Sequence, residues 1–138
     1  MAKYRSAKVL IFDADGHVLV LRRSGTHPTA AFEPDLPGGM IETGESHERG
    51  VVREIFEETR LLVDPGQLRR VDITRRPFAI MQRALFVAHL DQVRPSIEIS
   101  WEHDEYSWIP IESITKLEQP VQKRLNKIIK KKLHKKKL

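Results

Sequence analysis

The stretch from Gly39 to Leu61 constrains this chain more than any other part of its sequence. It reads GMIETGESHERGVVREIFEETRL, a glycine-containing turn followed by residues of helical composition. At 3.6 residues per turn, its apolar and its acidic side chains separate onto opposite faces. The expected buried face holds Val52, Ile55, Phe56 and Thr59, and the expected exposed face holds Glu54, Glu57 and Glu58. We therefore predict an amphipathic helix that shows a cluster of carboxylates to solvent.

The clustered carboxylates admit two interpretations. Like charges one helical turn apart repel by about 0.2–0.5 kcal/mol per pair. A solvated polar face tolerates that repulsion, and every amphipathic helix has such a face. A hard divalent cation would instead relieve the repulsion, because such ions prefer oxygen ligands. Periodicity alone leaves both interpretations open.

The spacing of this stretch is more specific than its periodicity. Gly39 is followed by five residues and Glu45, and Glu45 by seven residues and the run REIFEETRL, residues 53–61. This arrangement resembles the Nudix box of the Nudix hydrolase family, G-x5-E-x7-R-E-U-x-E-E-x-G-U, where U is an aliphatic residue. A chance match of its fixed and aliphatic positions at a given start is on the order of 10⁻⁷ to 10⁻⁸. The spacing therefore favours the metal-binding interpretation.

Arg60 departs from the box pattern, because the family has glycine at this position. That glycine ends the helix, and the residue there usually takes a left-handed conformation that only glycine adopts without strain. A non-glycine residue costs roughly 1 kcal/mol there, whereas the helix dipole favours a cation near the C-terminus. We expect Arg60 to affect the helix end and not the carboxylates.

The resemblance implies an α/β fold, the Nudix-type α/β/α sandwich in which helices flank a mixed β-sheet. It also implies hydrolysis of a pyrophosphate linkage with Mg²⁺, or alternatively Mn²⁺, as cofactor. By resemblance, Glu57, Glu58 and the carbonyl of Gly38 bind the metal. Glu54 either binds metal or accepts the proton of the attacking water, and Arg53 orients the acids through ion pairs.

Further positions are assigned on the same resemblance. Gly39 and Glu45 are expected to be structural, with Glu45 as a structural partner or an outer metal ligand and not the base. Glu102 or Glu105 would supply the further carboxylate that the family often contributes from this region, against the alternative of an exposed acidic loop. We place Glu102 with the metal ligands and Glu105 with the substrate-binding residues. His103, which has no metal-ligand spacing with another histidine, receives no role.

Substrate-binding residues are expected near the end of an early strand. Arg22 and Arg23 stand where the family places basic residues close to the substrate phosphates, although each is also compatible with ordinary surface charge. Phe32 lies in an irregular loop that borders the site. It would either stack on a base or anchor the loop by local packing.

The remaining sequence predicts strands and a terminal helix. Apolar runs and turn residues indicate a hairpin, then a second hairpin, a short β-prone piece, and a strand on which Tyr106 and Trp108 point together into the core. The expected strands are 7–12, 17–23, 68–74, 79–90 and 97–99. Val121, Leu125, Ile128 and Ile129 have helical spacing.

Charge is divided unevenly along the 138 residues. From Gln119 onward there are nine Lys or Arg and no acid, so residues 1–118 carry 15 basic and 19 acidic side chains, a net charge of −4. We predict a Nudix domain over residues 1–129, including a terminal helix, and a polybasic tail over 130–138. The tail could recruit nucleic acid, but a helix with a solvated lysine end is the favoured interpretation.

Other features bound the environment of the chain. Because there is no cysteine, disulfides, thiolate nucleophiles and cysteine-based zinc sites are excluded. No apolar run reaches transmembrane length, and the first residues lack the apolar core and cleavage site of a signal peptide. We expect a cytoplasmic protein without a membrane span, either a monomer or a homodimer.

The function expected from the resemblance is Mg²⁺-dependent cleavage of a nucleoside diphosphate linked to another group. A nucleoside triphosphate is the first choice of substrate, because the chain is short. A dinucleoside polyphosphate or a nucleotide sugar is the alternative. A nucleotide- or RNA-binding protein on a Nudix scaffold is an alternative of another class, which the intact set of acids disfavours.

Overall fold

A computed structural model describes residues 3–117 and 122–138 of the chain. The chain opens with two strands, β1 (Tyr4–Phe12) and β2 (His17–Arg23), joined by a tight turn. The carboxylate of Asp13 accepts hydrogen bonds from the amides of Asp15 (3.0 Å) and His17 (2.8 Å), which closes the turn. Gly16 has a φ of 82°, the positive value that glycine adopts without strain. The first predicted hairpin is confirmed, although β1 begins earlier than expected.

The sheet is mixed, as the sequence predicts. β6 (Met81–His89) runs parallel to β1 along its whole length, and β5 (Arg69–Ile73) is antiparallel to β6. The second predicted hairpin is therefore present. β3 (Pro34–Asp35) and β7 (His103–Pro110) pair with β2, and β4 (Gly38–Met40) pairs with β1. The prediction of a strand at residues 97–99 is wrong, because this segment has no regular secondary structure.

The first two strands separate soon after their turn. Their ladder is limited to Phe12 and Val18, next to the turn. Beyond it, β1 pairs with β4 over residues 6–8, while β2 pairs with β7 and β3. This divergence opens the sheet, and the chain segment that carries the glycine turn fills the gap.

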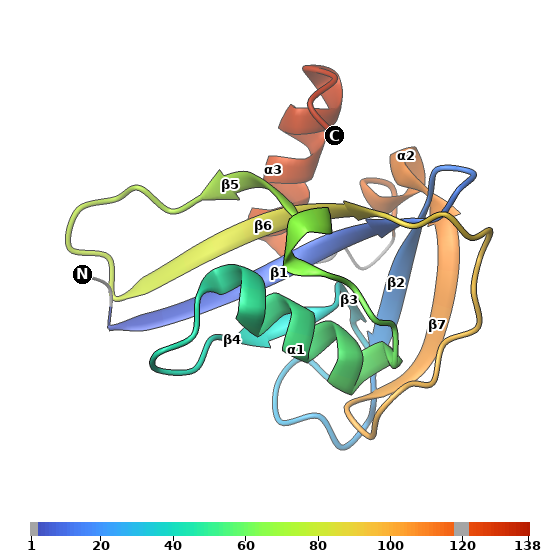
Figure 1. The fold of residues 1–138 in the computed structure, drawn as a ribbon, viewed down its shortest axis with the longest axis horizontal. Coiled ribbons are helices and arrows are strands. Elements are labelled where there is room, and N and C mark those ends of the chain that lie inside the picture. The colour runs from blue at the N-terminus through green and yellow to red at the C-terminus, as the bar shows by residue number, and fades with distance from the viewer. Residues whose placement is uncertain (1–2, 118–121) are drawn as a thin grey trace.

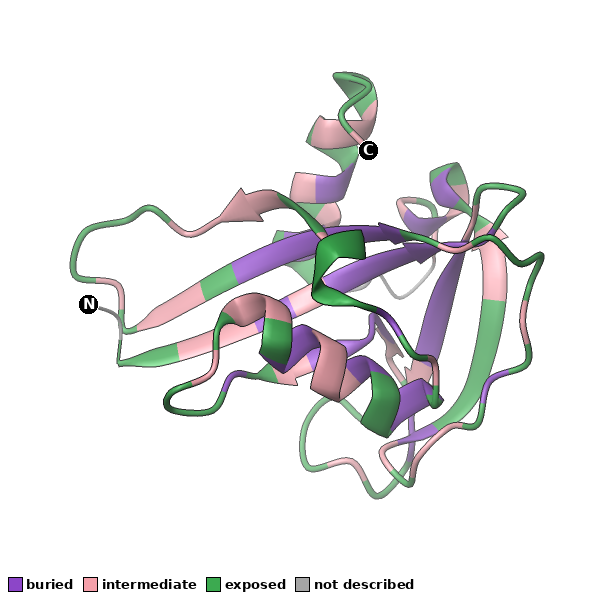
Figure 2. Ribbon diagram, viewed as in Figure 1, coloured by how far each residue is buried: buried purple, intermediate pink, exposed green. Residues whose placement is uncertain are grey.

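Helices cover both faces of the sheet and complete the α/β/α sandwich (Figure 1). α1 (His47–Thr59) lies on one face, and α2 (Ile111–Ile114) and α3 (Lys123–His134) lie on the other. A short 3-10 turn, Pro65–Gln67, precedes β5. Two buried apolar clusters result: α1 contributes Val51 and Ile55 to one, and α2 and α3 contribute to the other. Figure 2 shows the buried residues concentrated in the central strands between these layers.

The buried stripe of α1 differs from the predicted one by one position. Val51 is fully buried, whereas Phe56 remains 40% exposed. Glu58, expected on the solvent face, is only 2% exposed. The helix therefore packs along residues 51, 55, 58 and 59, which lie on one face at helical spacing. The expectation that all three acids face solvent is wrong for Glu58.

Two further burial predictions are settled by the fold. Trp108 packs against the α1-side cluster and donates a hydrogen bond to the carbonyl of Pro95 (3.3 Å), but Tyr106 is 39% exposed. Tyr106 and Trp108 both lie on β7, which pairs with β2, but the α1-side cluster includes Trp108 and not Tyr106. The prediction that both aromatic rings enter the core is wrong for Tyr106.

The terminal helix packs through the residues that its periodicity predicts. Leu125 and Ile129 are buried in the second cluster, with Ile128 beside them, while Val121 lies outside the described residues. α3 continues to His134, so the domain boundary expected after residue 129 falls inside it. In the described part of the chain, no helix is long and apolar enough to cross a bilayer.

Arg60 ends α1 in the left-handed conformation, with φ 63° and ψ 10°, and its amide donates to the carbonyl of Phe56 (2.9 Å). Its guanidinium lies 5.1 Å from the centre of the Phe56 ring. The arginine thus combines backbone strain with a stabilising contact.

Two substitutions at this position separate the strain from the contact. Arg60→Gly and Arg60→Ala both remove the guanidinium, but only glycine relieves the strain. We expect Arg60→Gly to have a free energy of unfolding about 1 kcal/mol higher than Arg60→Ala. Urea denaturation at one pH measures this difference, and equal stabilities would show that the left-handed conformation is unstrained.

Candidate active site

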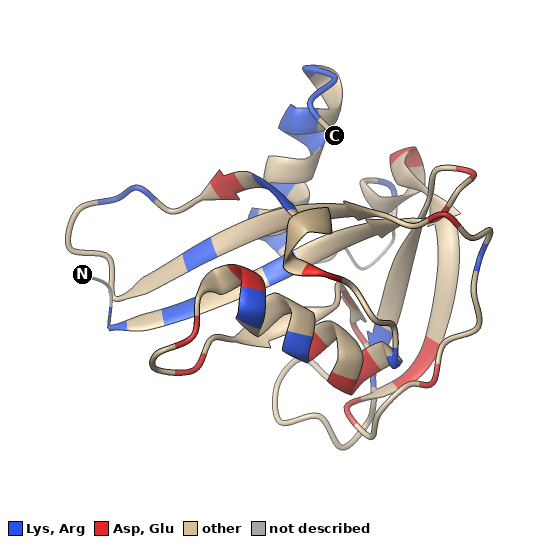
Figure 3. Cartoon of the chain, in the orientation of Figure 1, with Lys and Arg blue, Asp and Glu red and all other residues tan. Residues whose placement is uncertain are grey.

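The predicted acids line a cavity of about 470 Å³. It is bordered by the C-terminal half of α1, by β4, by the first residues of β1 and β6, and by the start of α3. Figure 3 shows acidic residues gathered on α1 and near the start of β7. The charged residues that line the cavity are Lys8, Arg23, Asp35, Glu54, Glu57, Glu58, Arg83, Glu102 and Arg124, with His27 beside them.

The paired glycines allow the backbone to approach these acids. Gly38 has a φ of 127°, and a Cβ atom there would lie 2.1 Å from the carbonyl oxygen of Ala7. A Cβ at Gly39 would lie 3.1 Å from the carboxyl carbon of Glu54. Side chains at these positions would push β4 away from β1 and from the helix. The amide of Gly38 also donates to Glu58 Oε1 (2.8 Å), which ties β4 to α1.

Arg53 connects the acids of the box. Its guanidinium contacts Glu45 (2.7 Å), Glu54 (3.1 Å) and Glu57 (3.3 Å) and donates to the carbonyl of Met40 (3.1 Å). Hydrogen bonding to Glu45, supported by the charges of the neighbouring acids, raises the pKa of Arg53. Glu45 is therefore a partner of the arginine. The ion pairs expected of Arg53 are present, and its orienting role stays a prediction.

A buried triad that the sequence analysis missed lies beneath these acids. His103 Nε2 is 3.1 Å from Asp35 Oδ2, and His103 Nδ1 is 3.5 Å from Glu58 Oε2. All three side chains are almost completely buried, and one ligand atom from each lies within 4.8 Å of the others. His103 Nδ1 has no hydrogen-bond partner among the described residues. The spacing of the histidines gave no signal for this role, because Asp35 is 68 residues away in sequence.

Lys8 is a second residue that the sequence analysis missed. Its ammonium group forms an ion pair with Asp35 Oδ1 (3.0 Å) and donates to the carbonyls of Leu36 and Gly38, both at 3.1 Å. The signal was present, since Lys8 interrupts the apolar run of a strand expected to be buried. The carbonyl of Gly38, which is expected to bind the metal, thus accepts a hydrogen bond from the ammonium group of Lys8.

Charge is balanced unequally within this network. Burial opposes ionisation of Asp35, but Lys8, the His103 ring and Arg23 outweigh burial and hold its pKa well below the usual range. For Glu58, burial dominates over Lys8 and the Gly38 amide and raises the pKa to about 8. Burial likewise raises the pKa of Glu54, with contributions from Glu57 and Glu102 that Arg53 opposes. Glu54 and Glu58 are therefore harder to ionise than Asp35.

The residues present fit a divalent cation. The cavity offers carboxylate oxygens from Glu54, Glu57, Glu58 and Glu102, the hard ligands that suit Mg²⁺ or Mn²⁺. Burial raises the pKa of Glu54 and of Glu58, and a bound cation would favour their ionised forms. His103 Nδ1, which has no hydrogen-bond partner among the described residues, lies 3.5 Å from Glu58 Oε2.

The predicted substrate-binding residues are divided between two cavities. Arg23 lines the acidic cavity, where it pairs with Asp35 (3.3 Å) and donates to Thr29. Arg22 points to the other face of β2 and lines a separate cavity of about 400 Å³ with Phe32 and Glu105. The structure therefore brings Glu102, but not Glu105, to the acids.

Arg22 is engaged by neighbours in its own cavity. It forms a two-point ion pair with Asp104 (2.7 and 2.9 Å) and a longer one with Glu105 (3.5 Å). Its guanidinium lies 5.9 Å from the centre of the Phe32 ring. Phe32 is thus exposed over an arginine and away from the cavity with the acids. The substrate-binding roles of Arg22, Phe32 and Glu105 stay predictions.

The pKa of Glu58 predicts a pH-dependent stability in the absence of metal. With its pKa raised to about 8, folded Glu58 keeps its proton to about pH 8, whereas the unfolded chain releases it near the ordinary value of 4.5. Between these values the folded state binds more protons, so rising pH favours unfolding. Glu58→Gln keeps an acceptor for the Gly38 amide and cannot ionise.

Relative to wild type, Glu58→Gln should therefore gain stability between about pH 5 and pH 8. We expect a gain of more than about 1 kcal/mol, the equivalent of roughly one pKa unit. Urea denaturation in the presence of a chelator measures it. A difference between the two proteins that does not change with pH would show that Glu58 ionises normally in the folded state.

Comparison with known proteins relates this site to a family. The model of the NUDIX domain matches residues 2–131. A crystal structure of the MutT protein from Methanosarcina mazei is similar, with a TM-score of 0.75 and 28% sequence identity over 99% of this chain and 97% of that one. An ADP-ribose pyrophosphatase of Methanocaldococcus jannaschii is 42% identical over 52 residues, and a MutT-like protein of Streptomyces ambofaciens is 39% identical over 54 residues.

These last two matches are partial. They cover 38% and 39% of this chain, and only 30% and 32% of the respective relatives. The NUDIX match, in contrast, includes every residue of the acidic cavity. On that match, and on the box of residues 39–61 within it, the chain belongs to the Nudix hydrolase family, whose members hydrolyse pyrophosphate bonds.

Proposed function

We propose that this protein is a divalent-metal-dependent hydrolase that cleaves the pyrophosphate linkage of a nucleoside triphosphate. The observation that carries the proposal is the convergence of Glu54, Glu57, Glu58 and Glu102 on one cavity that Arg23 also lines. A polyanionic substrate cannot approach these acids without cations. Mg²⁺ is the proposed cofactor, with Mn²⁺ as a substitute, and both match the all-oxygen donor set of the four carboxylates.

The protein residues divide the work of the reaction. Glu57, Glu58 and Glu102 would hold the metal, which when bound supplies positive charge to the pyrophosphate oxygens and promotes ionisation of water. Arg53 holds the carboxylates of Glu54 and Glu57 in place through its contacts at 3.1 and 3.3 Å. Glu54, whose pKa is raised by burial, is suited to accept the proton of the attacking water.

Basic residues that line the cavity would receive the phosphates. They are Arg23 at the end of β2, Arg83 on β6 and Arg124 on α3. Arginine forms two-point hydrogen bonds with phosphate oxygens. Together, these three arginines would hold a chain of phosphates within the cavity.

A second substrate is supported by the relatives. The M. jannaschii protein is an ADP-ribose pyrophosphatase, so a nucleotide sugar is the competing candidate, together with a dinucleoside polyphosphate. All three contain the linkage that the acids would cleave. They differ in the group beyond the second phosphate, which the cavity must accommodate.

A substrate panel with Mg²⁺, resolved by chromatography, tests the proposal. We expect a nucleoside triphosphate to give the monophosphate and pyrophosphate faster than ADP-ribose or a dinucleoside polyphosphate is cleaved. Faster cleavage of either alternative would replace the proposed substrate but keep the reaction. Binding without cleavage of any compound would indicate a nucleotide-binding protein instead.

The role of the exposed acid can be tested separately. Glu57→Gln should lower kcat by about 10² or more, the scale of losing a main electrostatic element. Glu48→Gln is a matched control, because Glu48 lies in the first turn of the same helix and does not line the cavity. Steady-state kinetics should show control activity near wild type. Similar kcat values for both variants would remove Glu57 from the proposed machinery.

A further inference from the structure

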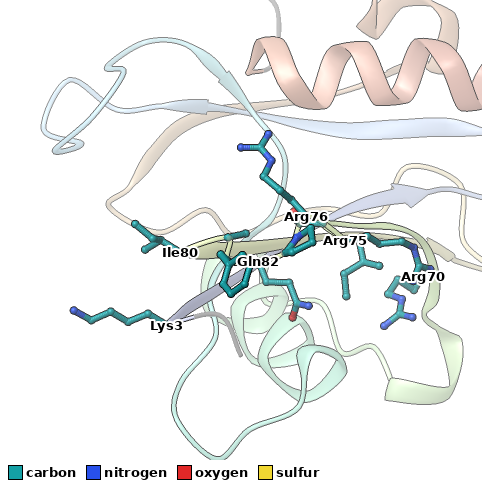
Figure 4. Close-up of a pocket in the computed structure, with 11 residues that line it drawn as sticks. Lys3, Arg70, Arg75, Arg76, Ile80 and Gln82 are labelled. Atoms are coloured by element: carbon teal, nitrogen blue, oxygen red, sulfur yellow. The ribbon is translucent and has the colours of Figure 1, made fainter.

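A separate cavity of about 750 Å³ lies at the hairpin that joins β5 to β6. Its lining includes four cationic residues and no acidic one (Figure 4). We call it the hairpin pocket. The cationic residues and the exposed large apolar residues of its lining are Lys3, Arg70, Arg75, Arg76, Phe78 and Ile80.

The hairpin pocket does not belong to the acidic cavity. Successive residues of β6 point to opposite faces of the sheet. Gln82 lines the hairpin pocket, whereas its neighbours Met81 and Arg83 line the acidic cavity. The first residues of β6 therefore separate the acidic cavity from the hairpin pocket, in which all the charged lining residues are cationic.

The hairpin pocket also presents apolar surface to solvent. Phe78 is fully exposed, and Ile80 is 69% exposed. Phe78 has a φ of 60°, an unfavourable conformation for an aromatic residue, and it joins neither buried cluster. The exposed ring therefore adds nothing to the packing of either buried cluster. A ligand with both a planar face and negative charge would match an exposed aromatic ring among arginines.

We propose that the hairpin pocket binds single-stranded nucleic acid. The guanidinium groups of Arg70, Arg75 and Arg76 would contact backbone phosphates, which arginine binds through paired hydrogen bonds. The ring of Phe78 would stack on a base. A lone phosphate would use the cations but not the ring. An acidic peptide would likewise leave the ring without a planar partner.

The positive surface continues beyond the hairpin pocket. Arg76 points from the hairpin toward α3 (Figure 4). Burial and Arg83, and to a smaller extent Arg76, lower the pKa of Arg124 at the start of that helix, while Asp72, 3.9 Å from Arg124, opposes them. Arg76, Arg83 and Arg124 therefore lie near one another, with one acid among them. A strand several nucleotides long could follow this path, whereas a mononucleotide would occupy only part of it.

Fluorescence anisotropy tests the proposal with 5′-fluorescein-labelled oligo(U) and oligo(dT) of about 12 nucleotides, within the usual range of site sizes. We expect wild type to bind in low salt and to weaken as salt rises. Phe78→Ala should raise Kd about fivefold or more through lost stacking. Arg75→Ala should raise Kd and reduce the salt slope by about 1.

Matched variants make these results specific. Phe56→Ala removes a partly exposed ring from α1, and Arg69→Ala removes a cation from the other face of β5, where Arg69 donates to the carbonyl of Lys137 (3.3 Å). We expect both to change Kd less than twofold. Phe78→Ala should also hydrolyse a small nucleotide at the wild-type rate, because Phe78 does not line the acidic cavity.

Four outcomes would overturn the proposal. Wild type fails to bind either oligonucleotide in low salt, or Phe78→Ala binds as tightly as wild type. A third such outcome is that replacing Lys135, Lys136 and Lys137 by serine removes the binding, whereas Phe78→Ala and Arg75→Ala leave it unchanged. Finally, a polyglutamate peptide displaces the oligonucleotide from wild type and from Phe78→Ala equally well, which would indicate an acidic protein partner.

Discussion

The buried pair of carboxylates, Asp35 and Glu58, is the constraint on which the rest of the site depends. Charges are costly to bury unless they are paired and hydrogen-bonded. Asp35 meets this condition through Lys8, Arg23 and His103, each within 3.3 Å. Glu58 meets it only in part, through the Gly38 amide and the more distant His103 ring. One carboxylate is thus stabilised as an anion, and its neighbour resists ionisation.

The hydrogen bonds made by Glu58 and Lys8 also position the glycine turn of the site. The hydrogen bond from Gly38 to Glu58 joins β4 to α1, and the bonds from Lys8 to the Leu36 and Gly38 carbonyls join the same turn to β1. The glycine turn is therefore held from both sides. Glu54 and Glu57 lie on the same helix as Glu58, so the contacts that fix Glu58 also place these two acids at the cavity. Burial disfavours the ionised form of Glu58, and a bound cation would stabilise that form.

Much of this arrangement is readable in the sequence, because it is local. The spacing from Gly39 to Leu61 predicts the helix, the acids and the glycine turn, and the break at Arg60 predicts where the helix ends. Two hairpins and the packing of α3 follow from apolar runs and periodicity. These features depend on residues a few positions apart.

What escaped prediction depends on pairing between distant segments. His103 reaches Asp35 because β7 and β3 both pair with β2, and Lys8 reaches Gly38 because β4 pairs with β1. The burial of Glu58 follows from how α1 rotates on the sheet, by one position from the stripe that periodicity suggests. The separation of Arg22 from Arg23 follows from strand alternation, once the faces of β2 are known.

In the proposed function, the acids of α1 hold a divalent metal ion. A crystal structure of the protein grown with Mn²⁺, with anomalous scattering recorded from the metal, tests it most directly. We expect an anomalous peak in the acidic cavity, at roughly 2.0–2.3 Å from carboxylate oxygens of Glu57 and Glu58. A fully occupied Mn²⁺ ion bound elsewhere, with both carboxylates free of metal, would contradict it.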